Sequence, residues 1–412
     1  MALDVQVIES CFVAPSAATP QKAQWLSSLD VTFADRGHTP TVYFYHSADA
    51  AIANFSEVTN RLKESLAKAL VAFYPFAGRL GVDDDGRPEI NCNGEGALFV
   101  VARSENTADD FNDLTPTKEL RRGFVTFLKC GGILLGAALH HAAQDAIGAF
   151  HFFQTWSAIA REGDGASFEL PCHDRTLLRA RSPPSVHPDT LSVFCPKVGL
   201  TEPLGPTVSR AFTITKDQIT SLKRICGGAS TFCAVSALVW QCVCLARWLP
   251  ADTEARLSFS TNVRRRLSPP LPDHYFGNAI ISLYAAGAAR DIASEALGSV
   301  AGRVRGAISR VDDELVRSVV DYYELFKIDN RALKGLRLKE TELRVVSWIG
   351  LPVYDVDFGW GMPRRMSRAE PAPAGYVHMM NNGPDADSGI RIVASMEAEH
   401  MDEFEKLLHA KL

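Results

Sequence analysis

Apolar residues recur along this chain at two spacings, and these spacings predict alternating helices and strands. Every fourth residue is apolar from Val58 to Leu70, with charged residues between them, which predicts an amphipathic helix that Pro75 would end. The apolar run over residues 125–139 is broken by Gly131 and Gly132, so it predicts two buried strands joined by a turn. The chain is therefore expected to be a mixed α/β protein.

The same alternation continues in the second half, without a sequence repeat. Between the halves, residues 179–206 contain six prolines, which exclude a regular helix and predict a surface linker. We therefore expect an N-terminal domain over residues 1–180, a linker over 181–206 and a C-terminal domain over 207–412. The other predicted strands are 41–45, 97–102, 208–215, 257–262, 279–284, 343–349 and 390–396, and the other predicted helices are 147–156, 231–248, 292–323 and 401–408.

Composition narrows the class of protein. With 412 residues, 46% of them hydrophobic and 22% charged, the chain can bury a large core. Its net charge is −5, and the basic cluster Arg264, Arg265 and Arg266 is short, so nucleic-acid binding is not expected. Nine cysteines without a Cys-x-x-Cys pair favour a reducing compartment, and no secretory signal is visible, so we expect a cytoplasmic protein. Polar residues interrupt the apolar stretch 230–249, which favours a buried helix over a membrane span.

Two adjacent histidines stand where one predicted strand ends. The apolar run over residues 133–139 leads into His140 and His141, and Asp145 follows at the start of a predicted helix. A histidine at such a junction, with a carboxylate one helical turn away, fits a general base and its anchor. By itself this pattern also arises by chance in a chain with 11 histidines, so the motif leaves both interpretations open.

Other site chemistries lack their sequence signatures. Neighbouring histidines on a strand point to opposite faces, and no further group of ligand residues stands nearby, so a metal centre is not expected. The chain has no Gly-x-Ser-x-Gly elbow and no Gly-x-x-x-x-Gly-Lys phosphate loop. The stretch Gly94-Glu95-Gly96 lacks the third glycine of a dinucleotide-binding fingerprint.

A second motif near the C-terminal end, taken together with the histidine motif, points to one protein family. Asp357-Phe358-Gly359-Trp360-Gly361 alone would predict only a tight turn. Together with the histidine motif it resembles the plant BAHD acyltransferase family, whose signatures are His-x-x-x-Asp-Gly and Asp-Phe-Gly-Trp-Gly. The resemblance covers nearly the whole chain and is strongest to the hydroxycinnamoyl-CoA branch. Residues 38–45, 74–80, 174–176 and 275–278 also carry it.

This resemblance implies two chloramphenicol-acetyltransferase-like α/β domains, joined by a long crossover, with the active site in a channel between them. His141 would be the general base, and acyl-CoA would be a co-substrate with no permanently bound cofactor. Asp145 would be structural and pair with an arginine of the second domain, either Arg264 or Arg266. The resemblance further implies a monomer and gives a scaffold role to the second motif: Asp357, Gly359, Trp360 and Gly361.

The resemblance also bears on the substrates. Relatives that acylate shikimate or quinate carry an arginine where this chain has Gly350, so we expect an amine acceptor such as spermidine, another polyamine or an aryl amine. An alcohol acceptor is the alternative. His38 matches an acceptor-side histidine of relatives, or is simply a polar residue before a strand. Ser230 and Thr231 begin a predicted helix, where they would bind a CoA phosphate or cap the helix.

Two departures from the family pattern stand close to the histidine motif. Ala146 replaces the glycine after Asp145, which suggests a shifted or slightly strained turn. Relatives also carry an additional stretch between Arg122 and Gly123, which holds a loop and the start of the strand that leads to the motif. A weakly active or inactive homologue that binds CoA esters without turnover is therefore the competing interpretation.

Overall fold

The computed structural model describes residues 4–46, 55–111, 114–122, 124–202, 205–326, 337–384 and 389–412, which form two compact units. The first unit comprises residues 1–179, 271–279 and 351–370. The second comprises residues 180–270, 280–350 and 371–412. Two segments from the second half of the sequence thus belong to the first unit. The predicted N-terminal domain, residues 1–180, does not include these segments. Gly123 and Pro203, on which two of our expectations fall, lie outside the described residues.

A six-stranded mixed sheet forms the centre of the first unit. All neighbouring strands are antiparallel except β6 and β7, which run parallel. In sheet order the strands are β1 (Gln6–Val13), β6 (Ala97–Ser104), β7 (Val125–Leu128), β8 (Ile133–His140), β3 (His38–Tyr45) and β15 (Arg365–Arg368). The sheet thus combines a strand from the second half of the sequence with five from the first half.

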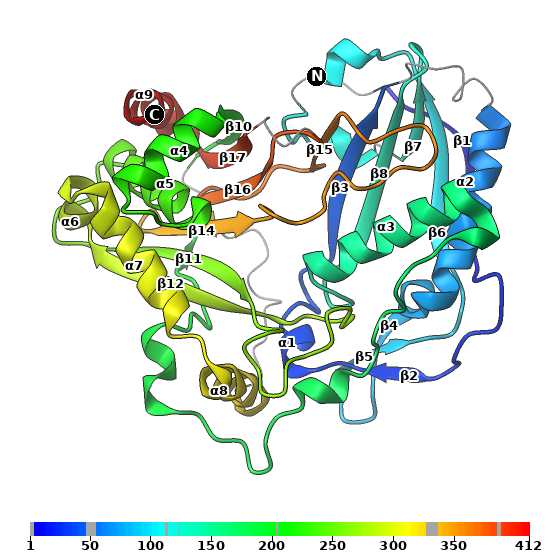
Figure 1. Ribbon diagram of the computed structural model, residues 1–412, viewed down its shortest axis with the longest axis horizontal. Coiled ribbons are helices and arrows are strands. Elements are labelled where there is room, and N and C mark those ends of the chain that lie inside the picture. Colours follow the sequence, from blue (N-terminus) through cyan, green and yellow to red (C-terminus); the bar gives the residue numbers. More distant parts are fainter. Residues whose placement is uncertain are drawn as a thin grey trace. The chain divides into compact units, whose positions relative to one another are not determined.

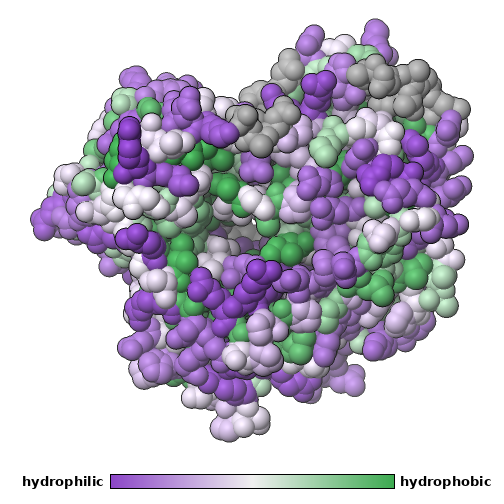
Figure 2. Space-filling model, in the orientation of Figure 1, coloured by the Kyte–Doolittle hydropathy of each residue, from purple (hydrophilic) through white to green (hydrophobic). Residues whose placement is uncertain are grey.

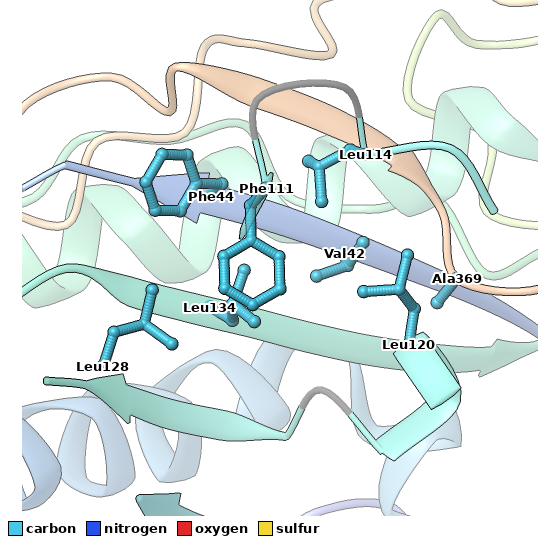
Figure 3. Packing of buried hydrophobic residues seen from close by; sticks show 8 residues of the cluster. All are labelled: Val42, Phe44, Phe111, Leu114, Leu120, Leu128, Leu134 and Ala369. Carbon is cyan, nitrogen blue, oxygen red and sulfur yellow. The ribbon is translucent and has the colours of Figure 1, made fainter. Parts of the chain in front are cut away.

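Two long helices cover one face of this sheet and short turns cover the other. Helices α2 (Phe55–Ala72) and α3 (Ala146–Glu162) lie side by side (Figure 1). Alternate residues of β3 point to opposite faces: the Tyr43 ring meets Phe153 of α3 with ring centroids 5.5 Å apart, whereas Val42 belongs to the other face. On that face, side chains from the chain between β6 and β7 close the core (Figure 3): Phe111, Leu114 and Leu120 pack with Val42, Phe44, Leu128, Leu134 and Ala369.

Strand β7 is short for its position. It spans four residues, whereas its two neighbours β6 and β8 span eight each. Even so, β7 keeps a regular register with both, because Val125 pairs with Val101 on one side and with Leu135 on the other. The neighbouring strand β3 pairs with β8 along all eight residues. The strand that leads to the histidine motif is therefore held mainly by β3.

The remaining elements of the first unit are small. A capping box at Ser27 and Asp30 starts the short helix α1 (Ser28–Val31). A separate sheet has the order β2 (Ala23–Trp25), β5 (Pro88–Asn91) and β4 (Arg79–Val82). The 3₁₀ helices are η2 (Tyr74–Ala77), η3 (Ala108–Phe111), η4 (Glu119–Arg122), η5 (Gly163–Gly165) and η6 (Arg175–Leu178).

The second unit is built on another six-stranded mixed sheet. Its order is β10 (Thr207–Ile214), β17 (Ile390–Glu397), β16 (Tyr376–Asn381), β14 (Glu342–Ser347), β11 (Glu254–Asn262) and β12 (Ile280–Ala288). Its helices are α4 (Lys216–Ile225), α5 (Thr231–Ala246), α6 (Ala289–Ser294), α7 (Leu297–Ser309), α8 (Asp313–Leu325), α9 (Ala398–Lys411) and η7 (Pro188–Ser192). Strands β9 (Leu200–Thr201) and β13 (Arg337–Leu338) pair separately.

The predicted fold class is confirmed, since each unit is a mixed sheet flanked by helices. Helix α5 is buried on nearly all sides, as the apolar stretch predicts, and no helix among the described residues is both long and apolar enough to cross a membrane. In the view of Figure 2, hydrophilic residues cover most of the visible surface of both units, and the apolar residues seen there form small groups.

Candidate active site

His141 lies in the first unit, in the turn that joins β8 to α3. Asp145 caps α3: its Oδ1 accepts hydrogen bonds from the backbone N–H groups of Ile147 and Gly148, at 3.1 and 3.3 Å. Its Oδ2 accepts the N–H of Ala279 at 3.0 Å. Asp145 therefore fixes the start of α3 and joins it to the segment 271–279.

Ala146 is the first residue of α3, and it does not have a left-handed backbone conformation. Alanine is the residue best suited to a helical conformation, so it fits this position without strain. The expectation that a missing glycine would strain the turn after Asp145 is therefore wrong. The helix begins directly after its cap.

Asn278 fixes the orientation of the His141 imidazole. The Asn278 side-chain NH₂ donates to Oδ1 of Asp30 at 2.9 Å and to the His141 carbonyl at 2.8 Å. Both partners only accept, so the remaining atom facing His141 is the amide oxygen, 3.1 Å from Nδ1. Nδ1 must then carry the proton. Nε2 keeps its lone pair, and it makes no hydrogen bond within the described part of the first unit.

A buried ion pair lies behind Asn278. Arg175 and Asp30 have fully buried side chains, with Nη1 of Arg175 2.9 Å from Oδ2 of Asp30. Arg175 also donates to the carbonyls of Ala142 and Ala143, at 3.3 and 2.6 Å, which fixes the backbone just after His141. Asp30 in turn accepts the backbone N–H of Asn278 at 2.7 Å. The turn is thus held from two sides by one ion pair.

The environment keeps His141 neutral. The pKa of His141 is lowered to about 4: burial is the main cause and the nearby Arg36 guanidinium adds to it, while Asp145 and Asn278 act in the opposite direction. Phe33 stacks on the imidazole with ring centroids 4.0 Å apart and an interplanar angle of 7°. At neutral pH the ring therefore has one donor, used by Asn278, and one acceptor at Nε2.

His140 serves a different purpose. Its Nδ1 accepts the backbone N–H of Ala142 at 3.2 Å, so the proton of a neutral His140 lies on Nε2, the opposite tautomer to His141. Its register partner on β3 is His38, whose ring meets it edge to face with centroids 5.0 Å apart. Burial lowers the pKa of His140 to about 4, and His38 contributes to that lowering. His140 thus closes the turn beside the proposed base.

The second motif lies at the other end of α3. Oδ1 of Asp357 accepts the N–H groups of Gly359 and Gly361, at 2.7 and 2.9 Å, and both glycines have positive φ. The Asp357 carbonyl accepts from Arg161, which is 16 residues after Asp145 and so about 24 Å along the helix. The two motifs therefore do not meet within the first unit.

Aromatic contacts anchor this second loop. The Phe358 ring lies 4.9 Å from Trp156 of α3, and the Arg61 guanidinium of α2 lies 5.1 Å from the Trp360 ring. The Tyr45 hydroxyl donates to the Val356 carbonyl at 2.8 Å. These contacts are what a scaffold would make, and the scaffold role of this loop stays a prediction.

The other predicted residues belong to the second unit. Ser230 caps α5, with its hydroxyl accepting the N–H of Cys233 at 3.2 Å, and Thr231 is the first residue of that helix. Arg264 is buried and donates to Oδ1 of Asn262, while Arg266 donates to the Val311 carbonyl at 3.4 Å. The pairing of Asp145 with Arg264 and the CoA contacts of Ser230 and Thr231 stay predictions.

Gly350, also in the second unit, has a φ of +78°, and a Cβ there would meet no atom within 4 Å. A side chain at this position would therefore have space but a strained backbone. The position suits the glycine that the sequence provides.

Sequence reasoning missed four residues around His141. Asn278 and Arg175 lie in stretches that carried the family resemblance, but the resemblance assigned them no role. Phe33 and Asp30 had no signal beyond a serine three positions before the aspartate, the pattern of a capping box. Their roles depend on contacts across as many as 248 positions of sequence.

The family model described as Transferase family matches residues 3–122 and 124–410. The chain belongs to the BAHD acyltransferase family. As a BAHD enzyme it is an acyl-CoA-dependent N- or O-acyltransferase, with acyl-CoA as its co-substrate.

Several curated BAHD proteins are similar to this chain over its full length. Putrescine hydroxycinnamoyltransferase 1 of Oryza sativa subsp. japonica is 43% identical over 446 residues, covering 99% of this chain and 99% of the relative. Shikimate O-hydroxycinnamoyltransferase of Nicotiana tabacum is 38% identical, covering 99% of this chain and 100% of the relative. A hydroxycinnamoyl-CoA:5-hydroxyanthranilate N-hydroxycinnamoyltransferase of Avena sativa is 37% identical, covering 98% and 99%.

Two solved structures share the fold. Vinorine synthase matches with a TM-score of 0.78 and 22% identity, covering 99% of this chain and 98% of the other. F. graminearum TRI101, complexed with coenzyme A and deoxynivalenol, matches with a TM-score of 0.76 and 17% identity, covering 93% and 97%. The expected pair of α/β domains is confirmed by this likeness.

The chain is short for the family. The alignment with the Oryza sativa relative runs over 446 positions, which exceeds the 412 residues of this chain by 34. The family match is interrupted at residue 123, just before the four-residue strand β7. This interruption lies at the place where relatives are expected to carry an additional stretch that this chain lacks.

Proposed function

We propose that this protein transfers a hydroxycinnamoyl group from its CoA thioester to an amine acceptor, with His141 as the general base. One observation carries the proposal: the Asn278 amide oxygen faces Nδ1 of His141, which leaves the Nε2 lone pair available. The similar proteins named above act as hydroxycinnamoyltransferases on putrescine, shikimate or 5-hydroxyanthranilate. These relatives support a hydroxycinnamoyl-CoA thioester as the donor. Their acceptors include both amines and alcohols, so they do not decide the acceptor class.

The proposed reaction needs no covalent enzyme intermediate. The neutral amine attacks the thioester carbonyl, and Nε2 of His141 takes the proton that the nitrogen loses as the new amide bond forms. The C–S bond then breaks, and the imidazolium returns this proton to the CoA thiolate. Because burial lowers the pKa of His141, its imidazolium is a stronger acid than an ordinary one and returns the proton readily, although the same shift makes the neutral ring a weaker base in the first half of the reaction. One residue thus serves both halves of the reaction.

An amine is the favoured acceptor because of Gly350. Relatives that use shikimate or quinate are expected to bind the acceptor carboxylate with an arginine at this position, and glycine supplies no such charge. A charge-assisted hydrogen bond contributes about 1.5–3 kcal/mol, or roughly a 10- to 150-fold preference. The 43% identity to a putrescine hydroxycinnamoyltransferase agrees with a polyamine such as putrescine or spermidine.

The inactive-homologue interpretation is disfavoured because the contacts that hold His141 are formed although the neighbouring strand β7 is short. The Asp145 cap, the Asn278 contact and the Arg175–Asp30 pair are all made within the first unit. Phe111, Leu114 and Leu120 close the sheet face beside β7. A chain that kept only CoA-ester binding would have no need for a histidine held in one tautomer.

The test is a panel of substrates. Purified protein is incubated with p-coumaroyl-, caffeoyl- or feruloyl-CoA and with putrescine, spermidine, tryptamine, shikimate or quinate, and products are identified by mass spectrometry. We expect amides to form at least tenfold faster than shikimate or quinate esters. A faster shikimate ester would contradict the amine assignment, and bound thioester without any product would contradict the enzyme assignment.

Gly350→Arg, with Gly350→Ala as its matched control, isolates the charge. Both variants strain the same left-handed backbone position, and only the first adds a guanidinium. We expect the arginine variant to raise kcat/KM for shikimate about tenfold over the alanine variant, at unchanged kcat/KM for the thioester. Equal values for the two variants would show that this position does not select the acceptor.

A further inference from the structure

Asp30 is a heavily hydrogen-bonded carboxylate that contacts Asn278, the partner of the His141 imidazole. Oδ1 accepts the backbone and side-chain N–H groups of Asn278, at 2.7 and 2.9 Å. Oδ2 accepts the backbone N–H and the hydroxyl of Ser27, at 3.0 and 2.7 Å, and pairs with Arg175 at 2.9 Å. The carboxylate therefore has no freedom to turn, and its Oδ1 is committed to Asn278.

This commitment decides which way the Asn278 amide faces. An asparagine side chain turned by 180° would place its NH₂ toward His141 and its oxygen toward Oδ1 of Asp30, an acceptor against an acceptor. The turned amide would also donate to Nδ1 of His141, which would force the imidazole proton onto Nε2. In that state the ring has no lone pair at Nε2 for a substrate proton.

We propose that Asp30 and Arg175 are positioning residues that hold His141 in its Nδ1–H tautomer through Asn278. Arg175 holds Asp30 in place through their ion pair, Asp30 orients the amide, and the amide oxygen accepts the hydrogen bond from Nδ1–H. Arg175 also holds the backbone just after His141 through the Ala142 and Ala143 carbonyls. The expected effect of Asp30 and Arg175 on the reaction rate rests on the proposed function. Their expected effect on the tautomer of His141 rests on the geometry alone.

The direct test measures the tautomer, which needs no turnover. In protein labelled with ¹⁵N-histidine, the His141 signals are assigned by their loss in His141→Gln and recorded at pH 7. We expect the Nδ1–H form in the wild-type protein and a loss of that form, wholly or in part, in Asp30→Asn. A wild-type Nε2–H form, or a tautomer unchanged by Asp30→Asn, would overturn the proposal.

The kinetic test compares two equivalent substitutions. Asp30→Asn is expected to lower kcat about a hundredfold with KM for the thioester within threefold, since losing a positioning contact costs 10- to 100-fold and the wrong tautomer costs more. Asp321→Asn is the matched control: its carboxylate is also buried and pairs with an arginine, Arg181, at 2.7 Å, but in the second unit. We expect this control to keep kcat within threefold.

A folded Asp30→Asn protein with kcat within threefold of the parent would refute the positioning role. If Asp30→Asn does not fold, Arg175→Lys replaces it with the same readings, because a single ammonium keeps the charge but cannot hold Asp30 and the Ala142 and Ala143 carbonyls together as the guanidinium does. A wild-type protein without transferase activity would reject the proposed function, whereas the tautomer measurement would still decide this inference.

Discussion

The first unit buries Arg175 against Asp30, and the second unit buries Arg247 and Arg337 against Glu397. In the second cluster, Arg247 donates to both oxygens of Glu397, at 3.1 and 3.2 Å, and Arg337 pairs with the same carboxylate. Arg247 also donates to the carbonyls of residues 340 and 342. These partners belong to α5, β13, β14, β17 or the chain beside them, so this cluster joins elements of the scaffold and, among the described residues, none of its contacts leads to His141.

The cluster in the first unit does not end in the scaffold. Its hydrogen bonds continue from Asp30 through Asn278 to His141, a half-buried ring with an acceptor atom left over. A buried ion pair by itself is weak evidence of stability, because desolvation offsets much of its attraction. The difference between the clusters is that, within the described part of the chain, only the first one leads to a side chain with a hydrogen-bond acceptor left without a donor. A buried ion pair connected to such a group points to a functional site.

Replacing His141 should give the largest functional effect. His141→Ala removes the general base, and we expect kcat to fall about 10²- to 10⁴-fold, while the urea midpoint of unfolding stays near that of the parent. Steady-state kinetics with the best donor and acceptor of the panel would measure it. His151→Ala, on the same unit, is the control and should lose less than threefold. A kcat of His141→Ala within threefold of the parent would remove His141 as the base.

Breaking the second cluster should give the opposite pattern. Glu397→Gln leaves two buried guanidinium groups without a carboxylate, and we expect the free energy of unfolding to fall by about 3–5 kcal/mol. Urea unfolding measures this loss, and kcat per folded molecule should stay within twofold. Glu403→Gln, which breaks an exposed pair with Lys406, should change stability by less than about 1 kcal/mol. If kcat of Glu397→Gln fell tenfold, the two clusters would not differ as described.

Acid should act on the first unit through its buried histidines. Burial lowers the pKa of His140, His141 and His173 to about 4, below their value near 6.5 in an unfolded chain. Between these values the unfolded chain binds more protons, so stability falls as pH decreases from about 6.5 to about 4 and levels off below that. Urea midpoints at pH 7, 6 and 5 would follow this decrease. In His173→Gln, the decrease over the same range should be smaller, and an equal decrease would contradict the assignment.

The parts of the fold that depend on local pattern were predictable from sequence. The helix after Asp145 follows from its apolar spacing, and the strand before His140 and the buried helix α5 follow from the length of their apolar runs and the residues that flank them. Strand β15, with only Met366 as an apolar residue, has no such pattern, and it exists because it pairs with β3 more than 300 positions earlier. Long-range pairing of this kind leaves no trace in a short window of sequence.

The same limit applies to the site. His141 and Asp145 stand four residues apart and form a visible motif, and the resemblance to BAHD enzymes gave them roles. Asn278 and Asp30 meet across 248 positions, and nothing in the residues near either one indicates the other. The tautomer of His141 is therefore a property that only the folded chain reveals.

The short strand β7 has a consequence for how this family varies in length. Because β8 is held by β3 along eight residue pairs, the chain between η4 and β7 can change length without moving the turn that carries His141. We therefore expect insertions and deletions in this segment to leave the chemistry at His141 nearly unchanged. The length of this connection can thus vary independently of the proposed base.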